Sequence, residues 1–134
     1  MRIFALVSLL ALAACDTVAV FPPEGAIVVN GFSLVTDRTV YDNGSDVTLT
    51  LRNDGPVQGE MGVLGCAILE QRTEAGWTAA LDRNDRVCIL MMVGVSPGQE
   101  IVAVADLDGV RDGTYRFVQP VSGMRVATAS FTVR

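Results

Sequence analysis

The sequence contains no histidine and no lysine, and its 10 basic residues are all arginines. Without histidine, the chain cannot form a Ser-His-Asp triad, a Cys-His pair or a histidine-ligated metal centre. Without lysine, it cannot bind phosphate through a Walker motif or form a Schiff base. We therefore expect a protein that is not an enzyme and that uses neither a cofactor nor a metal ion.

Charged residues are also few, at 19% of the 134 residues, and the formal net charge is −5 at pH 7. Because nucleic-acid-binding proteins carry a basic surface, this acidic balance predicts no nucleic-acid partner. Half of the residues are hydrophobic, which is too many for a disordered chain. The length suits one domain better than two.

The first 14 residues have the composition of an export signal. Met1-Arg2 gives a short positive start, and Ile3–Ala14 is apolar apart from Ser8. Twelve helical residues extend about 18 Å, well short of a hydrocarbon core of about 30 Å. The segment 1–14 is therefore predicted to be a signal helix that is removed, not a permanent membrane span.

The end of this segment, Leu12-Ala13-Ala14-Cys15, resembles the lipobox of bacterial lipoproteins. The resemblance implies that Cys15 receives a diacylglycerol on its thiol and becomes the first residue of the mature chain. The alternative is an ordinary signal peptide followed by a chance cysteine. Asp16 resembles an inner-membrane retention signal of enteric lipoproteins. We expect a protein of the bacterial envelope that faces the periplasm, with the lipid on Cys15 as its contact with the membrane.

The sequence has three cysteines, and assigning Cys15 to lipid leaves Cys66 and Cys88. In the oxidising space outside the cytoplasm, such a pair predicts a disulfide. Each of these two cysteines lies in an apolar run that is typical of a strand. Closing a loop of this size stabilises a fold by roughly 3 kcal/mol. The alternative is two small buried thiols that do not meet.

Short strands separated by turns are predicted for residues 32–134, after a tether over 15–31 that contains two adjacent prolines. Val47–Arg52 alternates apolar and polar residues, as a strand with one solvated face does. The expected strands are 32–35, 39–41, 47–52, 63–69, 87–93, 101–105, 114–121 and 126–133, with a hairpin loop at 73–76 whose return strand opens at Trp77 and a further edge strand over 27–29. Roughly seven to nine strands at this spacing are typical of an immunoglobulin-like antiparallel β-sandwich.

Two aromatic residues and the methionines are assigned to the core of this sandwich. Tyr115 begins a strand after a glycine-containing loop, as in a tyrosine corner, where the hydroxyl bonds back to the loop. Trp77 is interpreted as a core residue near the disulfide. Met61, Met91, Met92 and Met124 are interpreted as core residues and not as a copper site, because no histidine accompanies them.

Several segments together are similar to the immunoglobulin-like domains of small bacterial envelope lipoproteins. The segments are Val47–Asn53, Leu69–Arg72 followed by Gly76-Trp77, Pro97-Gly98, and Gly113–Phe117. The resemblance covers about the last three quarters of the chain. It implies a fold and an export route, and it supplies no catalytic residue.

The function that we expect from the sequence is that of a non-catalytic binding or scaffold module tethered to a membrane, with a protein partner. The alternative is an inhibitor of a protease or a cell-wall hydrolase, since an acidic domain can block a basic cleft. Two polar loops are the candidate contact regions. Their charged residues are Arg83, Asp85 and Arg86 in the first loop, and Asp106, Asp108 and Asp112 in the second.

Overall fold

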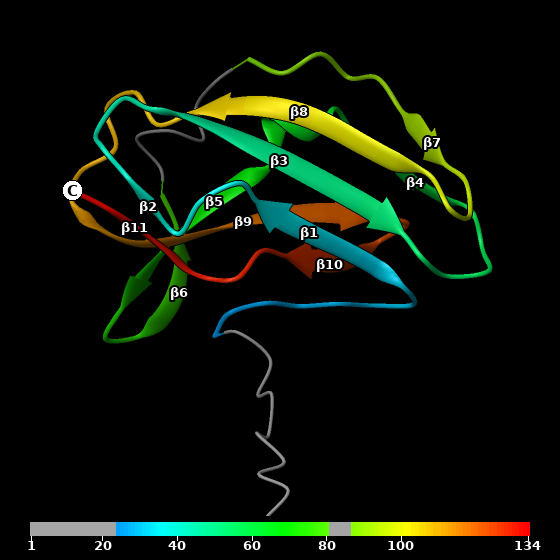
Figure 1. The fold of residues 1–134 in the computed structure, drawn as a ribbon, viewed down its shortest axis with the longest axis horizontal. Helices are drawn as coiled ribbons and strands as arrows, with labels where there is room; N and C mark the ends of the chain where they lie inside the picture. Colours follow the sequence, from blue (N-terminus) through cyan, green and yellow to red (C-terminus); the bar gives the residue numbers. More distant parts are fainter. Residues whose placement is uncertain (1–23, 81–86) are drawn as a thin grey trace, which may run out of the picture.

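The computed structural model describes residues 24–80 and 87–134, which form two β-sheets (Figure 1). The first sheet is antiparallel and has the order β1-β3-β8, made of β1 (Phe32–Thr36), β3 (Asp46–Asn53) and β8 (Glu100–Asp106). The prediction of an all-β fold is therefore confirmed. Within the described residues the only helix is the short 3₁₀ turn η1 (Leu64–Cys66).

The second sheet is built around the nine-residue strand β9 (Gly113–Val121). Antiparallel to β9 lie β4 (Gly59–Met61), β5 (Ile68–Thr73), β10 (Met124–Ala127) and β11 (Phe131–Val133). Three further strands extend this sheet: β2 (Val40–Tyr41) pairs in parallel with β11, β6 (Gly76–Ala79) with β5, and β7 (Val93–Val95) with β4. The described residues thus form eleven strands, where the sequence predicted seven to nine.

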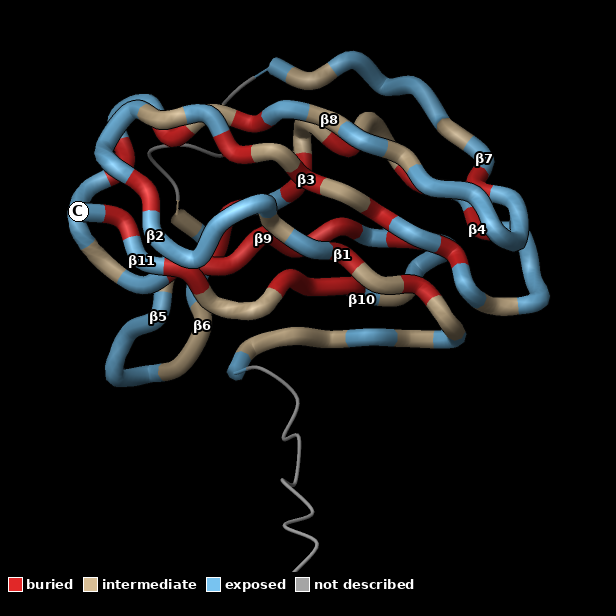
Figure 2. Tube along the Cα trace, viewed as in Figure 1, coloured by how far each residue is buried: buried red, intermediate tan, exposed pale blue. Residues whose placement is uncertain are grey.

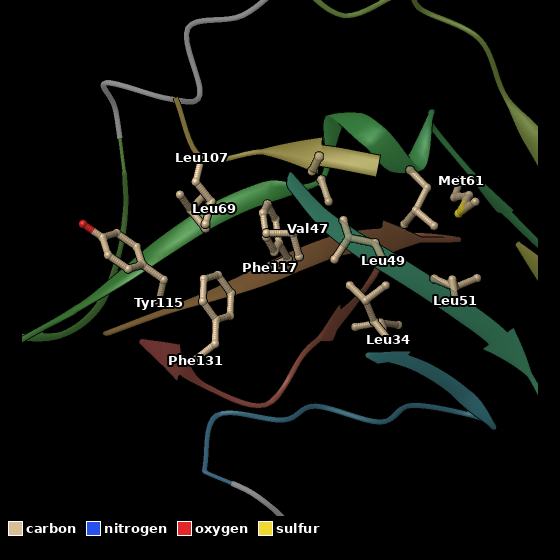
Figure 3. Packing of buried hydrophobic residues seen from close by; sticks show 14 of the residues in the cluster. Leu34, Val47, Leu49, Leu51, Met61, Leu69, Leu107, Tyr115, Phe117 and Phe131 are labelled. Atoms are coloured by element: carbon tan, nitrogen blue, oxygen red, sulfur yellow. The ribbon is translucent and has the colours of Figure 1, made fainter. Parts of the chain in front are cut away.

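The core lies between the two sheets and contains side chains from both (Figure 3). As the alternating pattern of β3 predicts, Val47, Leu49 and Leu51 are fully buried. Opposite them, Phe131 stacks on Phe117, with ring centroids 5.6 Å apart. Burial of apolar side chains of this size stabilises the fold by about 1.5–3 kcal/mol each. Figure 2 shows the same division, with buried segments inside and exposed segments along the rim.

The predicted tyrosine corner is confirmed. The Tyr115 hydroxyl donates a hydrogen bond to the Arg111 carbonyl oxygen at 2.9 Å, four residues upstream. A hairpin turn at Ser122-Gly123 joins β9 to β10, and both residues have positive φ angles, 48° and 78°. A two-residue turn of this kind matches the twist of the strands that it joins, β9 and β10.

The prediction of one central strand over 63–69 is wrong. The chain leaves the sheet at Gly62 and forms η1, where Cys66 N–H donates to the Val63 carbonyl at 3.0 Å. Pairing with β9 begins only at Ile68. The apolar run still reaches the core, because Leu64 and Ala67 are buried. Over these residues, hydrogen bonds within the 3₁₀ turn therefore replace hydrogen bonds between strands. The apolar pattern of the sequence does not reveal this difference.

The prediction of one strand over 126–133 is also wrong, because a bulge divides it into β10 and β11. From Ala127 to Phe131 the chain takes four steps, while the facing segment of β9 takes three, from Val118 to Tyr115. Thr128 compensates for the lost pairing. Its N–H donates to the Phe117 carbonyl at 2.9 Å, and its Oγ1 accepts from the Phe117 N–H at 3.0 Å.

The described chain begins at Glu24, inside the segment predicted to be a tether, and runs along the edge of the second sheet. Ile27 exchanges two backbone hydrogen bonds with Ala127 of β10, at 3.1 and 3.0 Å. The Glu24 carbonyl accepts from Ser130 N–H at 2.9 Å. The predicted edge strand over 27–29 is thus present only as isolated bridges. Residues 24–29 are nevertheless fixed to the body of the domain.

Candidate binding surface

The most exposed apolar segment of the described chain is Val87–Met92, which the sequence predicts to be part of a buried strand over 87–93. That prediction is wrong, because only β7, from Val93 onward, is a strand. Val87 and Leu90 are fully exposed, at 101% and 103%. Figure 2 shows this segment as an exposed stretch along the upper side of the molecule. A soluble domain exposes few contiguous apolar side chains of this size unless they serve a contact.

The backbone of this segment belongs to no strand or helix. Within the described residues, its one backbone–backbone hydrogen bond is from Met91 N–H to the Ile89 carbonyl, at 2.9 Å.

A disulfide joins Cys88 of this segment to Cys66 of η1, with their Cα atoms 6.0 Å apart. The predicted pairing is therefore confirmed. Neither cysteine lies in a strand, however, so the strand-like setting predicted for both is wrong. The bond fixes the start of Val87–Met92 to η1, which packs against β8. The exposed apolar side chains are thus held on a constrained backbone.

A groove of about 340 Å³ lies between this segment and the sheet. On one side it is lined by Ile89, Leu90, Met91 and Met92, and on the other by Ile68 of β5 and Pro120 of β9. The disulfide and Gln119 also line it. None of the described residues that line the groove is charged, which makes this lining suitable for an uncharged and largely apolar group.

The two polar loops predicted as contact regions are not both described. Arg83, Asp85 and Arg86 lie outside the described residues. Asp106 ends β8, where its Oδ1 accepts from Asp108 N–H at 3.1 Å. Asp112 Oδ1 accepts from Asn43 Nδ2 at 3.0 Å, and Asn43 N–H donates to the carbonyl of the C-terminal Arg134. This acidic loop therefore lies at the end of the molecule that holds the C terminus (Figure 1).

A buried ion cluster on the outer face of the second sheet was not predicted. Glu70 of β5 is 7% exposed and Arg116 of β9 is 8% exposed. Arg116 Nε donates to Glu70 Oε2 at 2.8 Å, and Arg125 of β10 donates to Glu70 Oε1. Burial raises the pKa of Glu70, but the hydrogen bonds from Arg125 and Arg116 outweigh it, so this pKa lies below its ordinary value.

Trp77 belongs to this cluster and not to the core, so the prediction of a core tryptophan is wrong. The guanidinium group of Arg116 lies 4.6 Å from the centre of the Trp77 ring, on its face. A second arginine, Arg72, lies 5.5 Å from it. Such cation–π contacts keep the ring half-buried beside charged groups. Arg116 Nη1 also donates to the Gly25 carbonyl at 2.8 Å, which connects the cluster to the start of the described chain.

The four methionines that were predicted to lie in the core divide into two pairs. Met61 is fully buried and Met124 packs against the core, as predicted. Met91 and Met92 are exposed, so the prediction that they pack in the core is wrong. The sequence pattern of the apolar run that contains them does not distinguish a buried strand from an exposed segment. The missing signal is the pairing partner, which only the tertiary structure supplies.

Over 24–80 and 87–134, Cys, Asp and Glu side chains do not gather in threes as metal ligands would. The same ranges contain no helix with the length and hydropathy that crossing a bilayer requires.

Comparison with known proteins gives no relative from which a function can be transferred. No protein-family model matches the chain, and no curated protein matches it. Among solved structures, it is similar to part of an alkylpurine DNA glycosylase, AlkC, from Pseudomonas fluorescens, bound to DNA containing an abasic site analog. The TM-score is 0.45 at 15% sequence identity, over 82% of this chain and 32% of that chain. The chain thus spans about a third of that protein, and a likeness this weak carries no argument about function.

Proposed function

We propose that this protein is a non-catalytic binding module of the bacterial envelope, tethered to a membrane through lipid on Cys15. We propose further that its body is an immunoglobulin-like sandwich and that its contact surface is Val87–Met92. The observation that carries the proposal is the full exposure of apolar side chains on a segment that a disulfide holds in place. Apolar patches of this kind on otherwise soluble domains are typical of protein–protein contact sites.

The position of this surface supports a partner on the side away from the membrane. In Figure 1 the described chain begins below β10, while Val87–Met92 runs along the upper side beyond β8. Nine residue steps lead from Cys15 to Glu24, and a fully extended chain of that length reaches at most about 32 Å. A lipid on Cys15 would therefore hold the domain close to the bilayer, with the apolar segment facing outward.

The tether is tested by mass spectrometry of the full chain isolated from bacterial membranes. We expect a mature N terminus at Cys15 that carries a diacylglycerol on sulfur. The variant Cys15→Ser should keep residues 1–14 and carry no lipid. An unmodified N terminus at Met1 in the native protein would contradict the proposal.

The contact surface is tested by placing a photo-cross-linking residue at Leu90 in the full-length, membrane-bound protein. The matched control is the same residue at Val57, another exposed apolar position in a loop. We expect a discrete adduct from position 90 that the second substitution Ile89→Asp removes, and none from position 57. Equal labelling from both positions, or no adduct from position 90, would show that the segment is not the contact surface.

A second candidate function is the inhibition of a protease. The specific observation in its favour is the exposed, disulfide-held segment Val87–Met92, which belongs to no strand and can enter a substrate cleft as a peptide does. This function requires that the purified chain slow an apolar-specific serine protease at micromolar concentration, and that Leu90→Asp abolish the effect. Rapid cleavage within the segment, or no effect on any protease or lysozyme, would exclude it.

A further inference from the structure

Met91 and Met92 are adjacent in sequence, and both side chains are exposed, at 54% and 67%. In a strand with one buried face, one of two neighbouring side chains would point into the core. Because Val87–Met92 belongs to no strand, both side chains reach solvent, and both line the groove. Two thioether side chains thus lie together on the proposed contact surface.

The other two methionines of the described residues are better protected. Met61 is 1% exposed and belongs to the core. Met124 is partly buried against the core, and its sulfur accepts a hydrogen bond from Asn30 Nδ2 at 3.1 Å. Because an oxidant must reach the thioether sulfur, the rate of oxidation follows exposure. An oxidant should therefore distinguish Met91 and Met92 from these two residues.

The described residues contain no thiol that would consume the oxidant first, because Cys66 and Cys88 are joined in the disulfide. The sequence has no histidine, and its one tryptophan, Trp77, is half-buried with Arg116 on the face of its ring. Both tyrosines are buried. Within 24–80 and 87–134, the exposed oxidisable side chains are therefore those of the two adjacent methionines.

We propose that Met91 and Met92 are an oxidation site whose modification releases the partner from Val87–Met92, a regulation that rests on the proposed function. The oxidant is a two-electron oxygen donor such as hydrogen peroxide. The thioether sulfur attacks one peroxide oxygen, so that an S–O bond forms while the O–O bond breaks. After proton transfer to the leaving oxygen, the products are methionine sulfoxide and water. Sulfur loses two electrons, and the peroxide gains them.

Oxidation should change the contact surface and leave the fold intact. Each sulfoxide is polar and places a hydrogen-bond acceptor beside the apolar side chains of Ile89 and Leu90. A partner surface that fits apolar side chains offers no donor to this oxygen. Burying one unpaired acceptor weakens binding by about 5- to 150-fold. The fold should persist, because neither Met91 nor Met92 belongs to the core or to a strand.

The oxidation site is tested by treating the full-length, membrane-bound protein with hydrogen peroxide and mapping the sulfoxides by peptide mass spectrometry. We expect sulfoxide at Met91 and Met92 while Met61 and Met124, the internal controls, are still reduced. The far-ultraviolet circular dichroism of the purified protein should stay unchanged at this stage. Equal rates of oxidation at all four methionines would overturn the inference.

The release is tested by the yield of the cross-linked adduct from position 90, before and after peroxide. In the otherwise native chain, oxidation should lower the yield about 5-fold or more. The double variant Met91→Leu, Met92→Leu stays apolar and cannot form sulfoxide, so it should keep its adduct after the same treatment. The double variant Met91→Gln, Met92→Gln imitates the polarity of the sulfoxide and should lose the adduct without any oxidant.

An adduct that survives oxidation of Met91 and Met92 would overturn the inference and leave the binding module standing. Equal loss of the adduct in the leucine variant would also overturn it, because the oxidant would then act elsewhere. If no adduct forms before treatment, the proposed function fails and the release fails with it. The mass spectra then still decide whether these two methionines are the oxidation site.

Discussion

Arg116 and Glu70 form a nearly solvent-free ion pair across β9 and β5, with Nε and Nη2 of the arginine 2.8 and 2.7 Å from Oε2 of the glutamate. Glu70 Oε1 accepts from Arg125, so one carboxylate joins three strands. Through the Gly25 carbonyl and the Trp77 ring, Arg116 also holds the chain that enters the domain. The cluster therefore fixes Gly25, which lies inside the segment predicted to be a tether, to the domain.

Glu70→Gln should destabilise the fold by about 3 kcal/mol, because it leaves the buried Arg116 without its counter-charge. The measurement is the free energy of unfolding in urea at neutral pH. Glu60→Gln is the matched control, since Glu60 lies on β4 and is exposed. It should change stability by less than about 0.5 kcal/mol. Equal effects of the two substitutions would show that the ion pair contributes nothing.

The ion pair of Glu70 and Arg116 also makes the free energy of unfolding depend on pH. The folded-state pKa of Glu70 is below its ordinary value of 4.5, so the folded state binds a proton less readily than the unfolded chain. The stability that Glu70 contributes is therefore complete above about pH 4.5 and is lost as the pH falls through its folded pKa. The native protein should lose more stability than Glu70→Gln over this acid range. Parallel pH profiles would contradict the assignment.

The sequence predicted the centre of this fold better than its edges. The alternation in Val47–Arg52 was sufficient to predict a strand with one buried face, because such burial places apolar residues at every second position. The position of Tyr115 after a glycine-containing loop was sufficient to predict the tyrosine corner. Glu70, Arg116 and Arg125 could not be matched from sequence, since pairing across three strands depends on register. No local pattern encodes that register.

The segment Val87–Met92 was predicted to be part of a buried strand for a related reason. The run Val87–Val93 has the pattern of a buried strand, but within the described residues Val87–Met92 has no pairing partner and is exposed. The disulfide was predictable because three cysteines in an exported chain leave one pair once Cys15 is assigned.

Tyr41 provides a prediction at the basic end of the pH scale. Its hydroxyl donates to Asp37 Oδ1 at 2.8 Å, and burial together with this hydrogen bond raises its pKa to about 12. Tyr115→Phe leaves Tyr41 as the sole tyrosine, so that the phenolate absorbance reports it alone. We expect titration near 12 in the folded state and near 10 in urea.

Because the pKa of Tyr41 is raised on folding, its contribution to stability is complete below about pH 10 and is lost as the pH approaches 12. Tyr115→Phe itself should cost about 1 kcal/mol at neutral pH, since it removes the bond to the Arg111 carbonyl. A folded-state titration at the ordinary value would show that the Tyr41–Asp37 bond does not form in solution.

Gly25 offers a test of how the chain enters the domain. Its φ is +82°, and a Cβ at this position would lie 2.9 Å from Trp77 Cζ2. Gly25→Ala therefore combines backbone strain with a clash against the ring that Arg116 covers. Gly109→Ala is the matched control, because Gly109 has a similar φ of +74° and nothing within 4 Å of such a Cβ.

Gly109→Ala should cost about 1–2 kcal/mol from the backbone alone, and Gly25→Ala should cost more. The readout that separates a local from a global effect is hydrogen exchange at the amides of Ile27 and Ala127, which bond to each other's carbonyls. Since Gly25 lies two residues before Ile27, Gly25→Ala should accelerate exchange at both amides, and Gly109→Ala should not. If both variants leave these amides equally protected, then the contact of Gly25 with Trp77 does not hold residues 24–29 on the sheet, and their bonds to β10 suffice.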